Sequence, residues 1–135
     1  MTSFVKIHVM HCGDVKVDKR LAFKDNVLSN VPKLGERSKE DQIWIPVSCY
    51  LIEHPLGLTV IDAGWSEKVR TSPEEQLGYA YQYCHPRLLE GQSIKEQLAV
   101  RNLTPSDIDY PHFSSGCGSY KWYSFTGGCK KIYCK

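Results

Sequence analysis

The stretch of residues 43–65 (IWIPVSCYLIEHPLGLTVIDAGW) constrains the fold more than any other part of this chain. It begins with a run rich in β-branched and aromatic side chains, passes through a His-Pro-Leu-Gly segment typical of a turn, and becomes apolar again. This pattern predicts a buried β-hairpin. Asp62 and Gly64 follow the second strand, where a carboxylate and a residue without a Cβ serve either a ligand site or a simple turn.

Alternating and charged patterns predict two further strands before the hairpin. Val5, Ile7 and Val9 alternate with polar residues, so we expect a half-buried strand with these three side chains on its buried face. Residues 14–23 predict a second, charged strand near a sheet edge, where lysines discourage further strand pairing. Residues 24–42 are polar and contain proline and glycine, which predicts a loop.

A helix and another strand are predicted after the hairpin. Ser-Ile-Lys-Glu at residues 93–96 is a capping box, in which the serine and glutamate side chains each accept a hydrogen bond from an exposed amide. Ile94, Leu98 and Leu103 mark the buried face of the helix, and residues 108–110 begin the strand. Strand, helix and strand at this spacing predict a crossover unit in an α/β sandwich.

Length and charge limit the classes of protein that this chain can represent. Its 135 residues suffice for one domain, and a net charge of +2 gives no field that favours nucleic acid or an anionic membrane. There is no run of about 20 apolar residues and no secretory pattern at the N-terminus, so we expect a cytoplasmic protein without nucleic-acid or membrane partners. The cysteines are then expected to be reduced, with Cys12 and Cys49 as small buried apolar residues.

The pattern IPVSCYLIEHPLG followed by LTVIDAGW resembles the opening hairpin of metallo-β-lactamase-fold hydrolases, and most of all the N-acyl homoserine lactonase branch. The resemblance covers about residues 5–110, and its most specific part is a strand, then Asp62-x-Gly64, then a helix-rich crossover. It implies an α/β fold: a partial metallo-β-lactamase-like αββα sandwich, with the mixed β-sheet and crossover helices of its N-terminal half.

The same resemblance implies the chemistry of a metal-dependent hydrolase. In intact relatives two zinc ions lower the pKa of a bound water and polarise the carbonyl of a small-molecule lactone or ester substrate. Asp62 would orient a metal ligand without binding the metal itself, and Gly64 would be the close-packing glycine beside it. Trp65, Tyr79 and Tyr81 are candidates for the wall of the substrate pocket. The alternative for the tyrosines is an amphipathic position on the surface, with the hydroxyl groups in water.

The metal-binding motif of the family is missing from this sequence. In the relatives, the strand after the crossover leads into Ser-His-x-His-x-Asp-His, with Asp in place of the second His in some members, and this motif holds one or two metal ions. Here Tyr110 is followed by PHFSSGCGSYKWYSFTGG, with one histidine, His112, and no carboxylate. The resemblance therefore assigns no catalytic residue and no metal ligand to this chain. We divide the chain into residues 1–110, the N-terminal half of a metallo-β-lactamase-like domain, and residues 111–135, an aberrant tail.

The codons of the tail are compatible with the missing motif if the nucleotide sequence is read one base later. The codons of residues 113–119 then allow Ser-His-Leu-Asp-Val-Asp-His, and residues 130–134 again have the pattern of a strand start. We hypothesise a one-base shift near Pro111, with the original frame regained near Gly128.

Three functions remain open on the sequence. The first is a truncated metal-dependent hydrolase of the lactonase type, inactive and without bound zinc as written. The second is a non-catalytic α/β domain that binds a partner, or a second copy of itself, through an uncovered sheet face. The third is a small structural zinc module formed by His112 with Cys117, Cys129 and Cys134, whose spacing lacks the paired knuckles of typical zinc sites.

Overall fold

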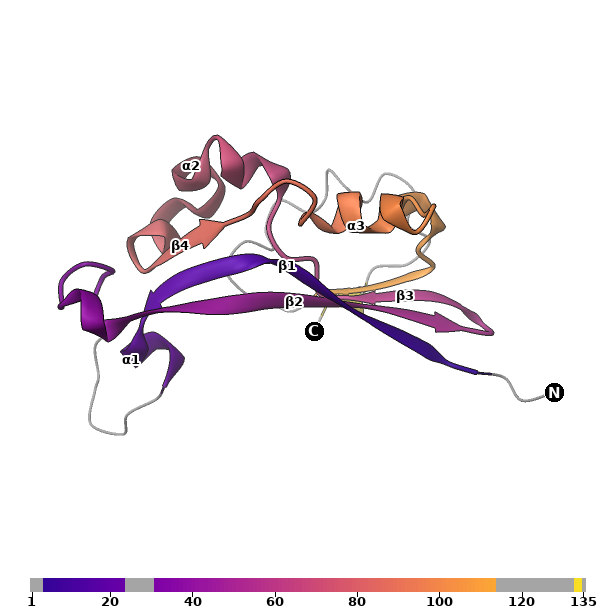
Figure 1. Cartoon of the computed structure of the whole chain (residues 1–135), viewed down its shortest axis with the longest axis horizontal. Coiled ribbons are helices and arrows are strands. Elements are labelled where there is room, and N and C mark those ends of the chain that lie inside the picture. The colour runs from indigo at the N-terminus through magenta and orange to yellow at the C-terminus, as the bar shows by residue number, and fades with distance from the viewer. Residues whose placement is uncertain (1–3, 24–30, 114–132, 135) are drawn as a thin grey trace.

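The computed structural model describes residues 4–23, 31–113 and 133–134, and its strands form one mixed sheet in the order β4-β1-β2-β3-β5-β6 (Figure 1). The strands are β1 (Lys6–Asp18), β2 (Gln42–His54), β3 (Gly57–Ile61), β4 (Cys84–Arg87), β5 (Tyr110–Phe113) and β6 (Tyr133–Cys134). The α-helices are α1 (Lys19–Ala22), α2 (Pro73–Leu77) and α3 (Ile94–Val100), and the 3-10 helices are η1 (Lys39–Asp41), η2 (Glu67–Arg70), η3 (Gly78–Gln82) and η4 (Pro105–Asp107). No helix in these described ranges is long and apolar enough to cross a membrane.

The predicted hairpin is confirmed. β2 and β3 pair in antiparallel fashion from Tyr50 opposite Ile61 to His54 opposite Gly57, so the turn consists of Pro55 and Leu56. β2 also pairs along most of its length with β1, which makes it the central strand of the sheet. The hairpin therefore organises the fold as the sequence predicted.

The predicted crossover is also confirmed. The chain leaves β3, passes through α3 and returns as β5, which lies parallel to β3. Both halves of the capping box are present: the Glu96 N–H donates to Ser93 Oγ at 3.1 Å, and the Ser93 N–H donates to Glu96 Oε2 at 3.0 Å. Ile94 and Leu98 are buried at the base of the helix, as the helical spacing predicted.

The prediction of a separate, edge-lying strand at residues 14–23 is wrong. β1 runs without interruption to Asp18, and its last residues pair with β2 on one side and β4 on the other. The register shifts between His11 and Asp14, which marks a β-bulge at Gly13. Gly13 has φ +90°, and a Cβ there would clash with the carbonyl oxygen of Arg87. The glycine allows the strand to continue through a bulge where the charge pattern suggested a break.

The prediction that Val5, Ile7 and Val9 lie on a buried face is also wrong, because these side chains are 51%, 63% and 66% exposed. Their alternation is real, but the opposite face of β1, with Met10 and Cys12 at 1% exposure, is the buried one. Figure 1 shows why: α2 and α3 lie on one side of β1, β2 and β3. We call this side the covered face and the other side the open face.

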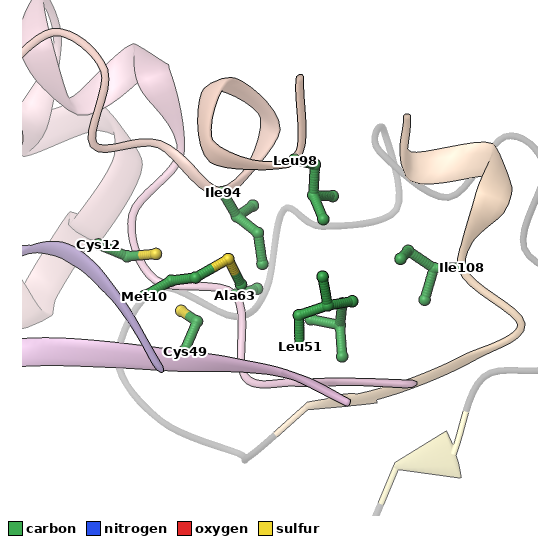
Figure 2. Close-up of a cluster of buried hydrophobic side chains, with 9 residues drawn as sticks. Met10, Cys12, Cys49, Leu51, Ala63, Ile94, Leu98 and Ile108 are labelled. Atoms are coloured by element: carbon green, nitrogen blue, oxygen red, sulfur yellow. The ribbon is translucent and has the colours of Figure 1, made fainter. Parts of the chain in front are cut away.

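The covered face carries the core as two clusters of buried side chains. The α3 cluster consists of Met10, Cys12, Cys49, Leu51, Val60, Ala63, Ile94, Leu98 and Ile108 (Figure 2). The α2 cluster consists of Val17, Trp65, Val69, Leu77, Cys84 and Leu88. β1 contributes to both, since the bulge at Gly13 restores the covered-face orientation at Val17.

A buried ion pair closes the end of the sheet beyond the α2 cluster. The Asp18 side chain is 1% exposed and accepts hydrogen bonds from Arg37 Nε at 2.9 Å and Nη2 at 2.7 Å. These bonds hold the pKa of the Asp18 carboxyl below its ordinary value. Asp18 also caps α1 by accepting from the Arg20 N–H. The carboxylate thus joins the loop before β2 to the end of β1.

Candidate functional site

The end of β3 places Asp62 at the edge of the sheet beside β5. The parallel pairing sets Ile61 opposite His112, and the Asp62 N–H donates to the His112 carbonyl oxygen at 2.8 Å. Asp62 has φ +62°, a left-handed conformation that aspartate tolerates better than most residues. Its Oδ1 accepts from the Ala63 N–H at 2.6 Å. The strand end is therefore a tight turn that presents a carboxylate next to a histidine-bearing strand.

Gly64 forms the most crowded point of this turn. It has φ +62°, and a Cβ there would lie 2.6 Å from Cys12 Cβ and 3.3 Å from Cys49 Sγ. Neither the backbone conformation nor the space accepts a side chain without a shift of the neighbours. Gly64 thus packs the turn directly against β1 and β2, and its place beside a metal site stays a prediction.

The three pocket candidates lie in different surroundings. Trp65 is 6% exposed, belongs to the α2 cluster, and donates from Nε1 to the Asp14 carbonyl oxygen at 3.0 Å. Tyr81 packs against the same cluster and stacks on His85 at 4.4 Å between ring centroids. Tyr79 is 71% exposed. The structure therefore brings Trp65 and Tyr81 together within one core and leaves Tyr79 on the surface; whether any of the three meets a substrate stays a prediction.

Sequence reasoning missed a contact between two thiols beneath this turn. Cys12 and Cys49 were predicted as separate buried residues, and at 1% and 0% exposure they are buried. Both side chains also lie against Gly64, which brings them close together. The signal that could have found the pair is the glycine after Cys12, since a glycine inside a strand pattern indicates a bulge that re-aims the preceding side chain.

Comparison with known proteins identifies relatives of the fold just described. N-acyl homoserine lactonase AttM of Agrobacterium fabrum is 36% identical over 66 residues, which are 49% of this chain and 25% of that protein. The corresponding protein of Azorhizobium caulinodans is 33% identical over 66 residues. An N-acyl homoserine lactone hydrolase solved with N-hexanoyl-L-homoserine at its catalytic metal centre superposes with a TM-score of 0.60 at 21% identity, over 83% of this chain and 40% of that one. No protein-family model matches the chain.

The chain has the metallo-β-lactamase fold of the N-acyl homoserine lactonases. The matched residues make up about a quarter of the length of the curated relatives, and the chain covers 40% of that solved hydrolase. A probable metal-dependent hydrolase from Staphylococcus aureus also superposes, with a TM-score of 0.52 at 26% identity. The predicted fold class is therefore correct for the part that the chain spans.

The described residues of the chain do not fit a metal ion. Within residues 4–23, 31–113 and 133–134, no three histidine, cysteine, aspartate or glutamate side chains gather closely enough to hold one. Two members of the hypothesised zinc module, Cys117 and Cys129, lie outside the described residues, as does most of the tail in which the shifted motif was predicted.

Proposed function

We propose that this chain is the N-terminal part of a metal-dependent hydrolase that opens a small-molecule lactone or a similar ester, and that the chain as written does not catalyse this reaction. One observation carries the proposal: the parallel pairing of β3 with β5 sets Asp62 and His112 at one edge of the sheet. The similarity to lactonases supports the reaction class. The site would lie where strands end, which is where sheets commonly hold their reactive groups.

Asp62 is the residue to which we assign a role in that site. A carboxylate that accepts the second ring N–H of a metal-binding histidine fixes the orientation of the imidazole and raises its basicity. The hydrolase would need histidine and carboxylate side chains beside Asp62 to hold two zinc ions, which would supply Lewis-acid chemistry. After Tyr110 the sequence as written has one histidine and no carboxylate side chain. We therefore attribute the loss of the metal-binding residues to the sequence of the tail and not to a change in the sheet.

The DNA that encodes residues 109–135 tests the origin of the tail. We expect one base to be missing or added near the codon of Pro111, so that the restored frame encodes Ser-His-Leu-Asp-Val-Asp-His. A nucleotide sequence that aligns without a shift to the genes of intact relatives would overturn this part of the proposal.

Assays of two proteins, the chain as written and the product of the shifted frame, test the reaction itself. The chain as written and the shifted reading, each extended to its natural stop codon, are assayed for bound zinc and for opening of N-hexanoyl homoserine lactone. We expect zinc and turnover only in the shifted reading, and a loss of turnover there in Asp62→Asn but not in Val100→Ala, since Val100 is 82% exposed. Turnover by the chain as written would contradict the proposal.

A second candidate function is the assembly of two copies through the open face. Cross-strand pairing aligns Ile7 with Ile52, and Val9 with Tyr50 and Ile61, so these apolar side chains lie side by side. Val9, Ile61 and Tyr50 are 66%, 41% and 37% exposed. Contiguous apolar patches of this kind mark interaction surfaces, and a two-fold symmetric pairing would bury the same patch on both copies.

Sedimentation velocity of the purified chain tests this second candidate. We expect a dimer that dissociates in Val9→Lys, because a buried unpaired ammonium group opposes association. Val100→Lys is the matched control, since Val100 is 82% exposed on α3, away from the open face. A wild-type chain that stays monomeric at every concentration, or a Val9→Lys dimer as tight as the wild type, would rule out this interface.

A further inference from the structure

Two thiols face each other in the α3 cluster, one from β1 and one from β2. Figure 2 shows both side chains within this cluster, and they are 1% and 0% exposed, respectively. In the regular part of the ladder Cys49 is opposite Met10, and Cys12 follows where the register shifts. In a regular antiparallel pair, such diagonal neighbours have Cα atoms about 7–8 Å apart. The bulge interrupts this regular spacing, and both side chains lie against Gly64.

Gly64 brings the two cysteines onto a common support. A Cβ placed on Gly64 would lie 2.6 Å from Cys12 Cβ and 3.3 Å from Cys49 Sγ. Both cysteine side chains therefore pack against the backbone of this one glycine. Gln97 Nε2 lies 3.5 Å from Cys12 Sγ and donates to it from α3. The pair is therefore held from three sides, by β1, by β2 and by the turn that follows Asp62.

The surroundings shift the pKa values of the two thiols in opposite directions. The neighbouring Cys49 thiol is the main cause that lowers the pKa of Cys12, against opposing effects of burial and of the Asp62 charge, while the charge of Arg101 helps to lower it. The Cys12 thiol, burial and the charge of Asp62 raise the pKa of Cys49. When the pair loses a proton, Cys12 therefore becomes the thiolate, which is the form of cysteine that attacks oxidants.

We propose that Cys12 and Cys49 form a reversible disulfide when a hydroperoxide reaches the protein. The Cys12 sulfur attacks one oxygen of hydrogen peroxide and the O–O bond breaks, which gives a sulfenic acid and hydroxide. The hydroxide takes up the proton that Cys12 lost and leaves as water. The Cys49 sulfur then displaces hydroxide from the Cys12 sulfur, and this hydroxide leaves as water with the Cys49 proton. Two thiols are oxidised and one peroxide is reduced to two waters.

The bulge is what makes the bond attainable in a buried sheet. A disulfide needs a separation of about 2.05 Å between sulfurs and about 3.5–4.5 Å between Cβ atoms. The residues between His11 and Asp14 lie at the register shift, where the regular ladder with β2 is interrupted. β1 can therefore shift locally at Cys12 without loss of the paired segments on either side. The bond would tie β1 to β2 directly beneath the turn that carries Asp62.

Peptide mapping of the full chain after oxidation tests the proposal. The folded protein is treated with hydrogen peroxide, alkylated, digested without reduction and analysed by mass spectrometry. We expect a peptide that links Cys12 to Cys49, which disappears after treatment with dithiothreitol. The same treatment in urea should give a mixture of links among all cysteines, because only the folded sheet selects this pair.

Variants separate the pair from the other thiols. Cys84→Ser should keep the Cys12–Cys49 link, because Cys84 lies in the α2 cluster and its Sγ donates to the Ala80 carbonyl oxygen. Cys49→Ser should leave Cys12 as a sulfenic acid that dimedone labels. Wild-type protein in which both cysteines stay reduced, or in which Cys12 links chiefly to a cysteine of the tail, would overturn the proposal, and this result does not depend on the folding of any variant.

Discussion

The two faces of the sheet carry similar apolar side chains and have different surroundings. On the covered face, Met10, Leu51 and Val60 are no more than 3% exposed beneath α3. On the open face, Ile7 and Val9 from the same strand as Met10 are more than half exposed. An apolar strand residue therefore stabilises this fold only where another layer covers it.

The largest expected effect is the loss of a side chain that joins α3 to the sheet. Leu98 is 0% exposed, so Leu98→Ala should lower the free energy of unfolding by about 2–5 kcal/mol through lost burial and a residual cavity. Val100→Ala, on the exposed side of the same helix, should change it by less than about 0.5 kcal/mol. Urea unfolding followed by circular dichroism measures both. Equal effects of the two substitutions would mean that α3 does not pack on the sheet as described.

The next effect compares two glycines that share a left-handed conformation. Gly64→Ala should cost about 2–4 kcal/mol, as left-handed strain and overpacking against Cys12 add. Gly91 has φ +81° and nothing within 4 Å of its would-be Cβ, so Gly91→Ala should cost only the strain, about 1–2 kcal/mol. The difference between their unfolding free energies isolates the crowding beneath Asp62. A Gly64→Ala variant no less stable than Gly91→Ala would show that the turn is loosely packed.

A buried valine and an exposed valine give the direct comparison between the faces. Val60 is 3% exposed and Val9 is 66% exposed. Threonine has nearly the same shape, so Val60→Thr should lower the free energy of unfolding by about 1–3 kcal/mol because it buries a hydroxyl. Val9→Thr should change it by less than about 0.5 kcal/mol. A marked loss of stability in Val9→Thr that grows with protein concentration would instead show that the open face is covered by a second copy.

The smallest expected effect concerns the ion pair between Arg70 and Glu96, which lies in the first turn of α3. Arg70 donates to Glu96 Oε2 at 2.7 Å and, with the Ser93 N–H, lowers the pKa of Glu96 from 4.5 to about 2. A carboxyl whose pKa is lower in the folded state stabilises the fold above its unfolded pKa, and this contribution is lost as the pH falls from about 4.5 towards 2. Unfolding in urea at about pH 6 and about pH 3 should therefore show a smaller decrease in stability for Glu96→Gln than for the wild type. An unchanged decrease would assign the acid sensitivity to other carboxyl groups.

Local patterns predicted the elements of the sheet but not which of its faces the helices cover. The hairpin, the capping box and the crossover depend on residues close together in the sequence, so their signals are complete within short windows. Which face of β1 is buried depends on where α2 and α3 pack, and an alternating strand with apolar residues on both faces carries no information about that. A glycine such as Gly13 inside a strand pattern can indicate a bulge, but it was interpreted as the end of a strand, and the charged residues after it as a separate strand.

The same contrast between local signals and long-range contacts applies to the candidate site. The sequence predicted the positions of Asp62 and Gly64 because a strand followed by Asp-x-Gly is a local signal. The burial of Trp65 follows from long-range packing with Val17 and Leu88, which no short window contains. The meeting of Cys12 with Cys49 required both the hairpin register and the bulge. Contacts between distant segments were therefore the part that the sequence did not reveal.

The bulge at Gly13 also fixes how the chain can change in length. Before it, even-numbered residues of β1 such as Met10 and Cys12 face the helices, and after it odd-numbered residues such as Val17 do so. Deletion of Gly13 would turn Val17 to the open face and Lys16 into the α2 cluster. A change of one residue in the length of β1 would therefore move side chains to the wrong face of the sheet. The turn at residues 55–56, in contrast, can lengthen without exchanging the faces of either strand.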